Sequence, residues 1–301
     1  MELIWLYTSL SLLLLFLAFK FLLEKSRNLP PRPVPTLPVI GHLHLLKQPL
    51  HRTLHKLSEK AGPIISLRFG NRLVVVVSSS SAAEECFTKN DIVLANRPRF
   101  TIGKYIGYNY STIGGSSYGD HWRNLRRLGT LEIFSASRLN MFLSTRQDEI
   151  KRLLCYLRQN SVNGGFAKVD LRSKLSELSF NVIMRMISGK RYGEDEGNEE
   201  AKHFRGLTAE VFRCAGMSNL GDYLPVLRWI DYKGFEKNLA NLGEKMDVFL
   251  QGLIDENRHD INSRNSMISH LLSLQQSQPD YYTDELIKGV MLVCVLPYIA
   301  L

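Results

Sequence analysis

Residues 119–128 read GDHWRNLRRL, and the rest of the chain is organised around this short stretch. Asp120 stands where a side chain can cap a helix, by accepting a hydrogen bond from a free N–H of the first turn. Trp122 and Arg126 then lie one turn apart on the same helical face. An indole N–H only donates and a guanidinium is always charged, so the pair offers two donors to one anion. We expect the carboxylate edge of a large flat ligand there; the alternative is a buried tryptophan beside a solvated basic stripe.

The positive charge of the chain is concentrated near its N-terminus. The whole sequence has 38 Lys and Arg against 29 Asp and Glu, a net charge of +9. Residues 24–75 hold nine of the cations and two of the acids, whereas residues 76–301 hold 28 against 26. Such a basic segment beside an apolar one favours an anionic membrane surface as a partner. Because no basic patch interleaved with aromatic residues continues into the globular part, we expect no nucleic-acid partner.

Residues 3–23 read LIWLYTSLSLLLLFLAFKFLL, about the 20 residues that a helix needs to cross a bilayer. A cleaved signal peptide, and with it a secreted helical protein, is the weaker alternative, because there is no basic segment before the run and no small-x-small cleavage site after it. Basic residues follow the span at positions 25–32. By the positive-inside rule we expect residues 1–23 to be a single-pass transmembrane anchor and residues 24–301 to lie in the cytosol.

Residues 24–41 are a basic, proline-rich hinge. Five prolines occupy the nine positions 30–38. Because proline fixes φ and removes a backbone donor, the segment is expected to be a stiff, extended spacer that orients the globular body on the membrane. A proline-rich peptide ligand is the alternative interpretation.

Residues 42–301 predict a mainly α domain with one small β-hairpin. A helix is expected over residues 49–61, where leucines recur at helical spacing. Two apolar runs joined by Gly70-Asn71 predict the hairpin, namely PIISLRF (63–69) and RLVVVVS (72–78).

Two weaker local patterns follow the hairpin. Ser81 and Glu84 have the spacing of a capping box, which predicts a short helix over residues 82–90. Residues 91–119 have no sustained period, and their aromatic content indicates an ordered, functional loop.

From Asp120 onward the pattern is helical. Two helices with one apolar stripe each are predicted over residues 137–160 and 170–188. The segment 193–200 is expected to be a solvated acidic loop. Further helices are predicted over residues 201–215, 233–258 and 265–277, and a very apolar one begins at Thr283-Asp284-Glu285.

The four cysteines are scattered and show no Cys-x-x-Cys spacing. Ordinary thiols of a reducing compartment are therefore expected, with no disulfide set and no zinc site. They are Cys86, Cys155, Cys214 and Cys294.

Taken together these pieces resemble the N-terminal half of a plant microsomal cytochrome P-450, a haem-thiolate monooxygenase. The resemblance rests on the anchor, the proline strut, the hairpin, the helix ending in TKND, the Arg-Pro loop and YGDHWRNLRRL (118–128), and it runs from residue 1 to about residue 295. The words FGNRLVVVVSSSSAAEECFTKNDIVLANRPRF (69–100) are most similar to the group that hydroxylates isoflavonoid and related phenolic rings. The implied fold is an N-terminal transmembrane helix followed by an incomplete cytochrome P-450 fold.

The resemblance implies roles for particular residues. Trp122 and Arg126 match the family's Trp-x-x-x-Arg pair, which hydrogen-bonds a haem propionate. The loop 100–118 matches its first substrate-contacting loop and residues 207–224 match its second. Three residues in these regions are candidate substrate contacts, with core or lid packing as the alternative for each: Tyr105, Ile106 and Phe212.

Family membership would also bring partners. It implies an NADPH-dependent reductase that supplies electrons, a hydrophobic small-molecule substrate, and residence in the endoplasmic reticulum membrane.

Two signatures of the resembled family do not occur in this sequence. The helix that begins near Thr283 reads LIKGVMLVCV and then LPYIAL, without the Ala/Gly-Gly-x-Asp/Glu-Thr word for oxygen activation. The Phe-x-x-Gly-x-Arg-x-Cys-x-Gly loop that carries the axial thiolate is also missing. We therefore expect no catalytic and no metal-ligating residue in this chain, doubtful haem binding, and an inactive truncated or mis-spliced product.

Some short matches to motifs of the resembled family are interpreted as chance matches with a structural role. Cys214 begins Cys-Ala-Gly, but nothing upstream of it fits a haem loop, and Cys294 is expected to be a small core residue. Two Glu-x-x-Arg words are expected to be surface pairs one turn apart, Glu149–Arg152 and Glu210–Arg213.

Two functions stay open at this point. One is the N-terminal part of a membrane-bound monooxygenase acting on a phenolic molecule. The other is a non-catalytic, membrane-anchored product that binds partners or is degraded.

Overall fold

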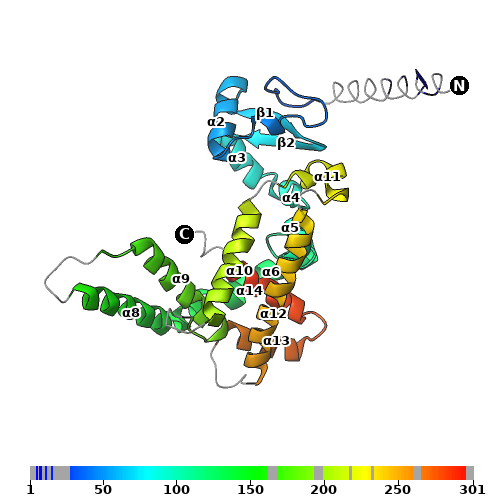
Figure 1. Ribbon diagram of the computed structural model, residues 1–301. Helices are drawn as coiled ribbons and strands as arrows, with labels where there is room; N and C mark the ends of the chain where they lie inside the picture. Colours follow the sequence, from blue (N-terminus) through cyan, green and yellow to red (C-terminus); the bar gives the residue numbers. More distant parts are fainter. Residues whose placement is uncertain are drawn as a thin grey trace. The chain divides into compact units, whose positions relative to one another are not determined.

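The structure is a computed structural model that describes residues 28–161, 168–192, 199–216, 219–231, 234–259 and 266–295, with a few isolated positions before them (Figure 1). It divides into two compact units, Met1–Asp91 and Ile92–Leu301. The expected anchor, residues 1–23, lies almost entirely outside the described residues. Within the described part of the chain, no helix combines the length and the apolar composition needed to cross a bilayer.

The first unit is built on the expected antiparallel hairpin, which the structure confirms. Strand β1 (Ile64–Phe69) pairs with β2 (Arg72–Val77) so that Ile64 lies opposite Val77. Around the hairpin lie the 3-10 turn η1 (Leu43–Leu45), helix α2 (Leu50–Ala61) and helix α3 (Ser80–Phe87).

The described part of the proline-rich hinge packs on β1. The Ser66 backbone N–H donates to the Pro31 carbonyl at 2.9 Å, and the Arg68 N–H donates to Nδ1 of the buried His42 at 2.8 Å. Gly41 has a φ of 64°, and a Cβ there would collide with the Arg68 carbonyl. These residues thus lie against the hairpin as an extra layer, because the proline-rich backbone offers its carbonyls to β1.

The described residues of the second unit are helical. Their first elements are α4 (Asp91–Leu94), α5 (Thr101–Tyr105), α6 (Asp120–Arg127), the π-helical turn η2 (Leu128–Ile133), α7 (Ala136–Met141), α8 (Leu143–Ser161) and α9 (Leu171–Ser188). Then come α10 (Glu199–Gly216), the 3-10 turn η3 (Leu220–Asp222), α11 (Pro225–Trp229), α12 (Phe235–His259), α13 (Met267–Ser277) and α14 (Asp284–Val295).

The core of this unit surrounds α14, drawn in red in Figure 1. Helix α14 packs against α12 and α9, and α10 packs against α12. Ile287 and Met291 of α14 are fully buried. The rings of Phe204 (α10) and Phe249 (α12) stack with centres 3.9 Å apart. The apolar pattern that predicted a helix after Thr283 therefore marks a helix of the core of this unit.

The predicted helix over residues 137–160 is wrong in two respects. It is divided at Phe142 into α7 and α8. Its apolar stripe is also only partly buried, since Ile150 and Leu154 are 46% and 58% exposed. The most buried position of this turn is instead Glu149, which is 2% exposed.

Helix caps also differ from expectation. The hydroxyl of Ser79 accepts from the Ala82 N–H, so Ser79 caps α3 and Ser81 lies inside the helix. Asp120 is the first helical residue rather than the cap of α6, and it pairs with Arg123 instead.

The expectation at the start of α14 is confirmed, because Thr283 Oγ1 accepts from the Leu286 N–H at 3.3 Å. Of the expected acidic loop, residues 193–198 lie outside the described residues, and Glu199 and Glu200 open α10.

Candidate functional site

Trp122 and Arg126 lie side by side on α6, as their spacing requires. The guanidinium carbon of Arg126 is 5.3 Å from the centre of the indole ring, a cation–π arrangement. The ring of Tyr118 lies 5.5 Å from the indole and tilts against it. Arg126 is exposed and Trp122 half-buried, so both N–H donors remain within reach of a ligand.

An apolar cavity lies beside α6. Leu125 of α6 and Gly129 of η2 line it, whereas Trp122 and Arg126 do not. The opposite wall belongs to α14 and the remaining wall to the loop before α6. The other lining residues are Ser111, Thr112, Ile113, Ile133, Phe134, Leu286, Gly289, Val290, Val293 and Cys294.

The three predicted substrate contacts do not line this cavity. The Tyr105 hydroxyl donates to Glu236 Oε1 at 2.6 Å. Ile106 is 5% exposed and belongs to the core, and Phe212 is half-buried on α10. The loop contributes Ser111–Ile113 to the cavity wall instead. Sequence reasoning identified the loop 100–118 but not these residues within it, because the loop has no periodic pattern that would mark them.

The cysteine in the cavity wall is a protonated thiol. Cys294 is 7% exposed, as expected for a core residue, and burial raises its pKa to about 12. Burial also raises the pKa of Cys214 on α10. A haem-ligating cysteine has to be a thiolate, and desolvation disfavours that form at both positions.

These residues fit a haem only in part. The apolar character of the walls suits the faces of a porphyrin, but the cavity volume of about 40 Å³ is far below that of a haem. The Trp122 and Arg126 donors on α6 suit its propionates. Among the residues that the structure describes, no group of three or more His, Cys, Asp and Glu side chains could hold a metal ion. The cysteine in this wall is also unsuited to be the axial ligand.

Comparison with known proteins assigns the family. Residues 30–295 match the family model described as Cytochrome P450. The chain belongs to the cytochrome P450 family. Family membership implies haem as the cofactor and a reductase as the redox partner.

Plant members of the family are close in sequence. The chain is 60% identical to cytochrome P450 81Q32 of Catharanthus roseus, over 97% of this chain and 58% of that protein. It is 53% identical to the isoflavone 3'-hydroxylase of Medicago truncatula, over 95% of this chain and 59% of that protein. It is 52% identical to the isoflavone 2'-hydroxylase of Glycyrrhiza echinata, over 94% and 58%. The chain thus spans somewhat more than half the length of these relatives and is related to isoflavonoid hydroxylases.

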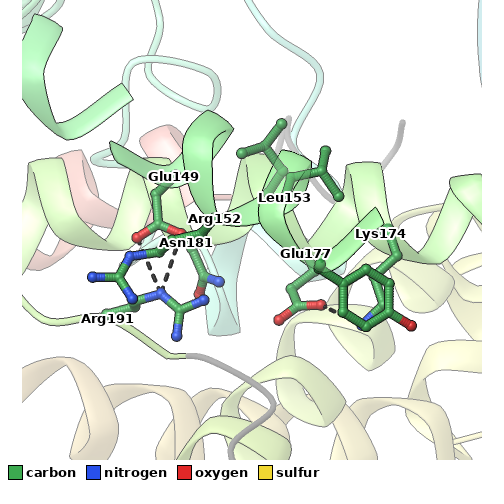
Figure 2. A pocket seen from close by; sticks show the side chains of 9 residues that line it. Glu149, Arg152, Leu153, Lys174, Glu177, Asn181 and Arg191 are labelled. Carbon is green, nitrogen blue, oxygen red and sulfur yellow. Dashed lines mark hydrogen bonds and ion pairs between the residues drawn. The ribbon is translucent and has the colours of Figure 1, made fainter. Parts of the chain in front are cut away.

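A second hollow lies between α8 and α9 (Figure 2). Its deepest charge is the carboxylate of Glu149, which accepts from Arg185 Nη1 at 2.7 Å and from Arg191 Nε at 3.1 Å. Figure 2 shows the Arg191 guanidinium against this carboxylate and the separate Lys174–Glu177 pair further along the groove, at 3.0 Å. The charged side chains in this hollow pair with one another, and these pairs hold α8 and α9 together.

The Glu-x-x-Arg interpretation therefore needs one correction. Glu149 is not in a surface pair with Arg152, because it is buried and Arg152 Nε donates to Asp148 at 3.1 Å. The other Glu-x-x-Arg motif forms the expected exposed pair, with Arg213 and Glu210 3.3 Å apart.

Proposed function

We propose that the chain is the N-terminal part of a membrane-anchored haem-thiolate monooxygenase that hydroxylates a flat phenolic molecule of the isoflavonoid type. O2 and electrons from an NADPH-dependent reductase are the co-reactants. The observation that supports this most directly is the pair of donors that Trp122 and Arg126 form on α6, the helix whose Leu125 lines the cavity. The identity of 52% and 53% to two isoflavone hydroxylases supports the substrate class.

Each part of the site has a distinct task in this proposal. Trp122 and Arg126 hold the propionate edge of the haem through two donors, one of them charged. The walls from α14 and from Ser111–Ile113 supply the apolar surface against which a flat apolar molecule would lie. The haem, once bound, supplies the iron at which oxygen is activated.

Attachment to the endoplasmic reticulum membrane, with residues 24–301 in the cytosol, belongs to the same proposal. It is supported by the apolar run at residues 3–23 and by the surplus of cations in residues 24–75.

A haemin titration tests the role of the donor pair. The full chain in detergent is titrated with haemin, and binding is followed by quenching of tryptophan fluorescence. Because a hydrogen bond to a charged group contributes about 1.5–3 kcal/mol, Arg126→Ala should weaken haemin binding about 10- to 100-fold. Arg127→Ala, one residue further along α6, is the matched control and should bind as the parent does. Equal affinity of both variants would contradict the proposal.

For residues 1–301 alone we infer a non-catalytic protein, because their sequence does not contain the Phe-x-x-Gly-x-Arg-x-Cys-x-Gly motif that carries the axial thiolate in this family. The reduced, haemin-loaded chain under carbon monoxide should then lack the Soret band typical of thiolate ligation in this family. Appearance of that band would overturn the non-catalytic interpretation.

A further inference from the structure

The loop that supplies Ser111–Ile113 to the cavity wall is held from its far side. Its short helix α5 has five residues, too few to be stable alone. The segment from η3 to α12 contacts the loop through three carboxylates, Asp222, Glu236 and Asp247, which do not line the cavity.

Asp222 holds the start of α5. Its Oδ1 accepts from the Thr101 backbone N–H at 2.8 Å and from the Thr101 hydroxyl at 2.7 Å. Thr101 is 2% exposed, so these bonds are made away from bulk water. Beside them the rings of Phe100 and Tyr223 meet edge to face, with centres 6.2 Å apart. One carboxylate thus supplies the cap that the α5 sequence lacks.

Glu236 holds the end of α5. Its Oε1 accepts from the Tyr105 hydroxyl at 2.6 Å and lies 3.4 Å from Lys104 Nζ. Its Oε2 is 3.3 Å from Arg228 Nε. The Glu236 N–H donates to Asp231 at 2.8 Å, which fixes the start of α12. A single carboxylate therefore ties both α5 and α11 to α12.

The third contact joins a buried lysine to a partly exposed carboxylate. Lys288 of α14 is 6% exposed, and its Nζ lies 2.5 Å from Asp247 Oδ1 and 5.5 Å from the ring centre of Tyr108. Tyr108, Asn109 and Tyr110 all have positive φ, at 46°, 51° and 65°. Non-glycine residues hold such angles only where the surroundings determine them, so this turn is kept in place by its neighbours.

The backbone of α5 also lies directly against α12. A Cβ added at Gly243 would be 2.6 Å from the Tyr105 carbonyl oxygen. The glycine is thus needed for the close approach that the carboxylate contacts require.

We propose that Asp222 and Glu236 are positioning residues: by fixing α5 against α12 they set the place of Ser111–Ile113 and so determine which flat ligands the cavity accepts. The proposal rests on the proposed function for the identity of that ligand. The Asp247–Lys288 pair is a third contact beside this loop, in which Lys288 is buried and Asp247 is partly exposed.

Amide hydrogen exchange of the full chain in detergent tests the contacts. Glu236→Ala and Tyr105→Phe should each raise the exchange rates of residues 101–112 about tenfold, since a hydrogen bond to a charged group is lost. Because Glu236→Ala already removes the acceptor of the Tyr105 hydroxyl, the double variant should exchange no faster than Glu236→Ala alone. Glu210→Ala, in the exposed Glu210–Arg213 pair, is the control and should leave this region unchanged.

A conservative substitution at Asp222 provides a control for the test at this residue. Asp222→Ala should speed exchange at residues 101–104, whereas Asp222→Asn keeps an oxygen acceptor and should stay within about threefold of the parent. Exchange unchanged in Asp222→Ala and Glu236→Ala would overturn the proposal, as would additive effects in the double variant.

Ligand binding separates positioning from a purely structural role. An unsubstituted isoflavone is titrated by tryptophan fluorescence, and Glu236→Ala should weaken its binding about five- to tenfold while Glu210→Ala does not. Faster exchange with unchanged isoflavone affinity would refute the positioning role. The haemin titration with Arg126→Ala does not depend on the α5 contacts, so its failure would refute the proposed function and leave the exchange result standing.

Discussion

Arg185 Nη1 of α9 lies 2.7 Å from Glu149 Oε1 of α8, and this contact joins two helices through a carboxylate that is 2% exposed. Arg191 adds a second charged bond from the segment that follows α9. Removing one partner of a buried pair leaves the other charges uncompensated. The pair therefore fixes how α8 lies on α9.

Glu149→Ala should accordingly destabilise the second unit by about 3–5 kcal/mol. Urea denaturation followed by far-UV circular dichroism measures this in the detergent-solubilised chain. Glu210→Ala, which breaks an exposed pair, should cost less than about 1 kcal/mol. Similar midpoints for the two variants would show that Glu149 is solvated after all.

Two glycines of α12 should respond in opposite ways to alanine. A Cβ at Gly243 meets the Tyr105 carbonyl at 2.6 Å, whereas a Cβ at Gly252 has no neighbour within 4 Å. Gly243→Ala should cost about 1–3 kcal/mol through overpacking, and Gly252→Ala should add up to about 1 kcal/mol through helix propensity. Thermal denaturation of both variants checks the contrast, and a stabilised Gly243→Ala would refute the close approach.

Ser79 rather than Ser81 should carry the cap of α3. The Ser79 hydroxyl accepts from the Ala82 N–H, so Ser79→Ala should cost about 1 kcal/mol. Ser81→Ala should be neutral or slightly stabilising, because alanine favours a helix interior. Chemical denaturation of the two variants distinguishes them, and the reverse order would restore the capping-box interpretation.

Predictions of local structure were confirmed where one or two neighbouring residues determine the backbone geometry. Gly70-Asn71 between two apolar runs correctly predicted the hairpin, and Thr283 before an apolar run correctly predicted the start of α14. The spacing of Trp122 and Arg126 put them on one face for the same reason. The α3 cap failed because several consecutive serines, at positions 78–81, offer competing starts.

Contacts between residues far apart in the sequence could not be predicted from local patterns. Periodicity assigns a glutamate to the solvent face, yet Glu149 is buried because Arg185 and Arg191, more than 30 residues away, compensate its charge. The loop residues that line the cavity were missed in the same way. Their position depends on Asp222 and Glu236, more than 100 residues further along the chain.

Asp284 should make the free energy of unfolding depend on pH in the acid range. Burial opposes its charged form, but hydrogen bonds from Gln275, Gln251 and Arg258 outweigh that effect and lower its pKa to about 2. A lowered folded-state pKa stabilises the fold above the ordinary value near 3.8, and this stability is lost as the pH falls towards 2.

Asp284→Asn should therefore reduce the free energy of unfolding at pH 7 by about 1–2 kcal/mol, after allowance for solvent screening. The difference from the parent should shrink between pH 4 and pH 2. Urea denaturation across that range measures it. Asp280→Asn, at an exposed position in the preceding turn, is the control, and a pH-independent difference for Asp284→Asn would contradict the linkage.

Thiol reactivity tests the state of the cavity cysteine. Burial raises the pKa of Cys294 to about 12, and the thiolate is the form that alkylating reagents attack. In the folded chain at pH 8, Cys294 should remain unmodified by iodoacetamide while the exposed Cys155 is labelled. Peptide mass spectrometry over a time course reads out both sites, and labelling in urea supplies the unfolded reference. Equal labelling of the two cysteines in the folded chain would show that the Cys294 thiol is open to solvent, and it would reopen the question of whether this residue can ligate haem iron.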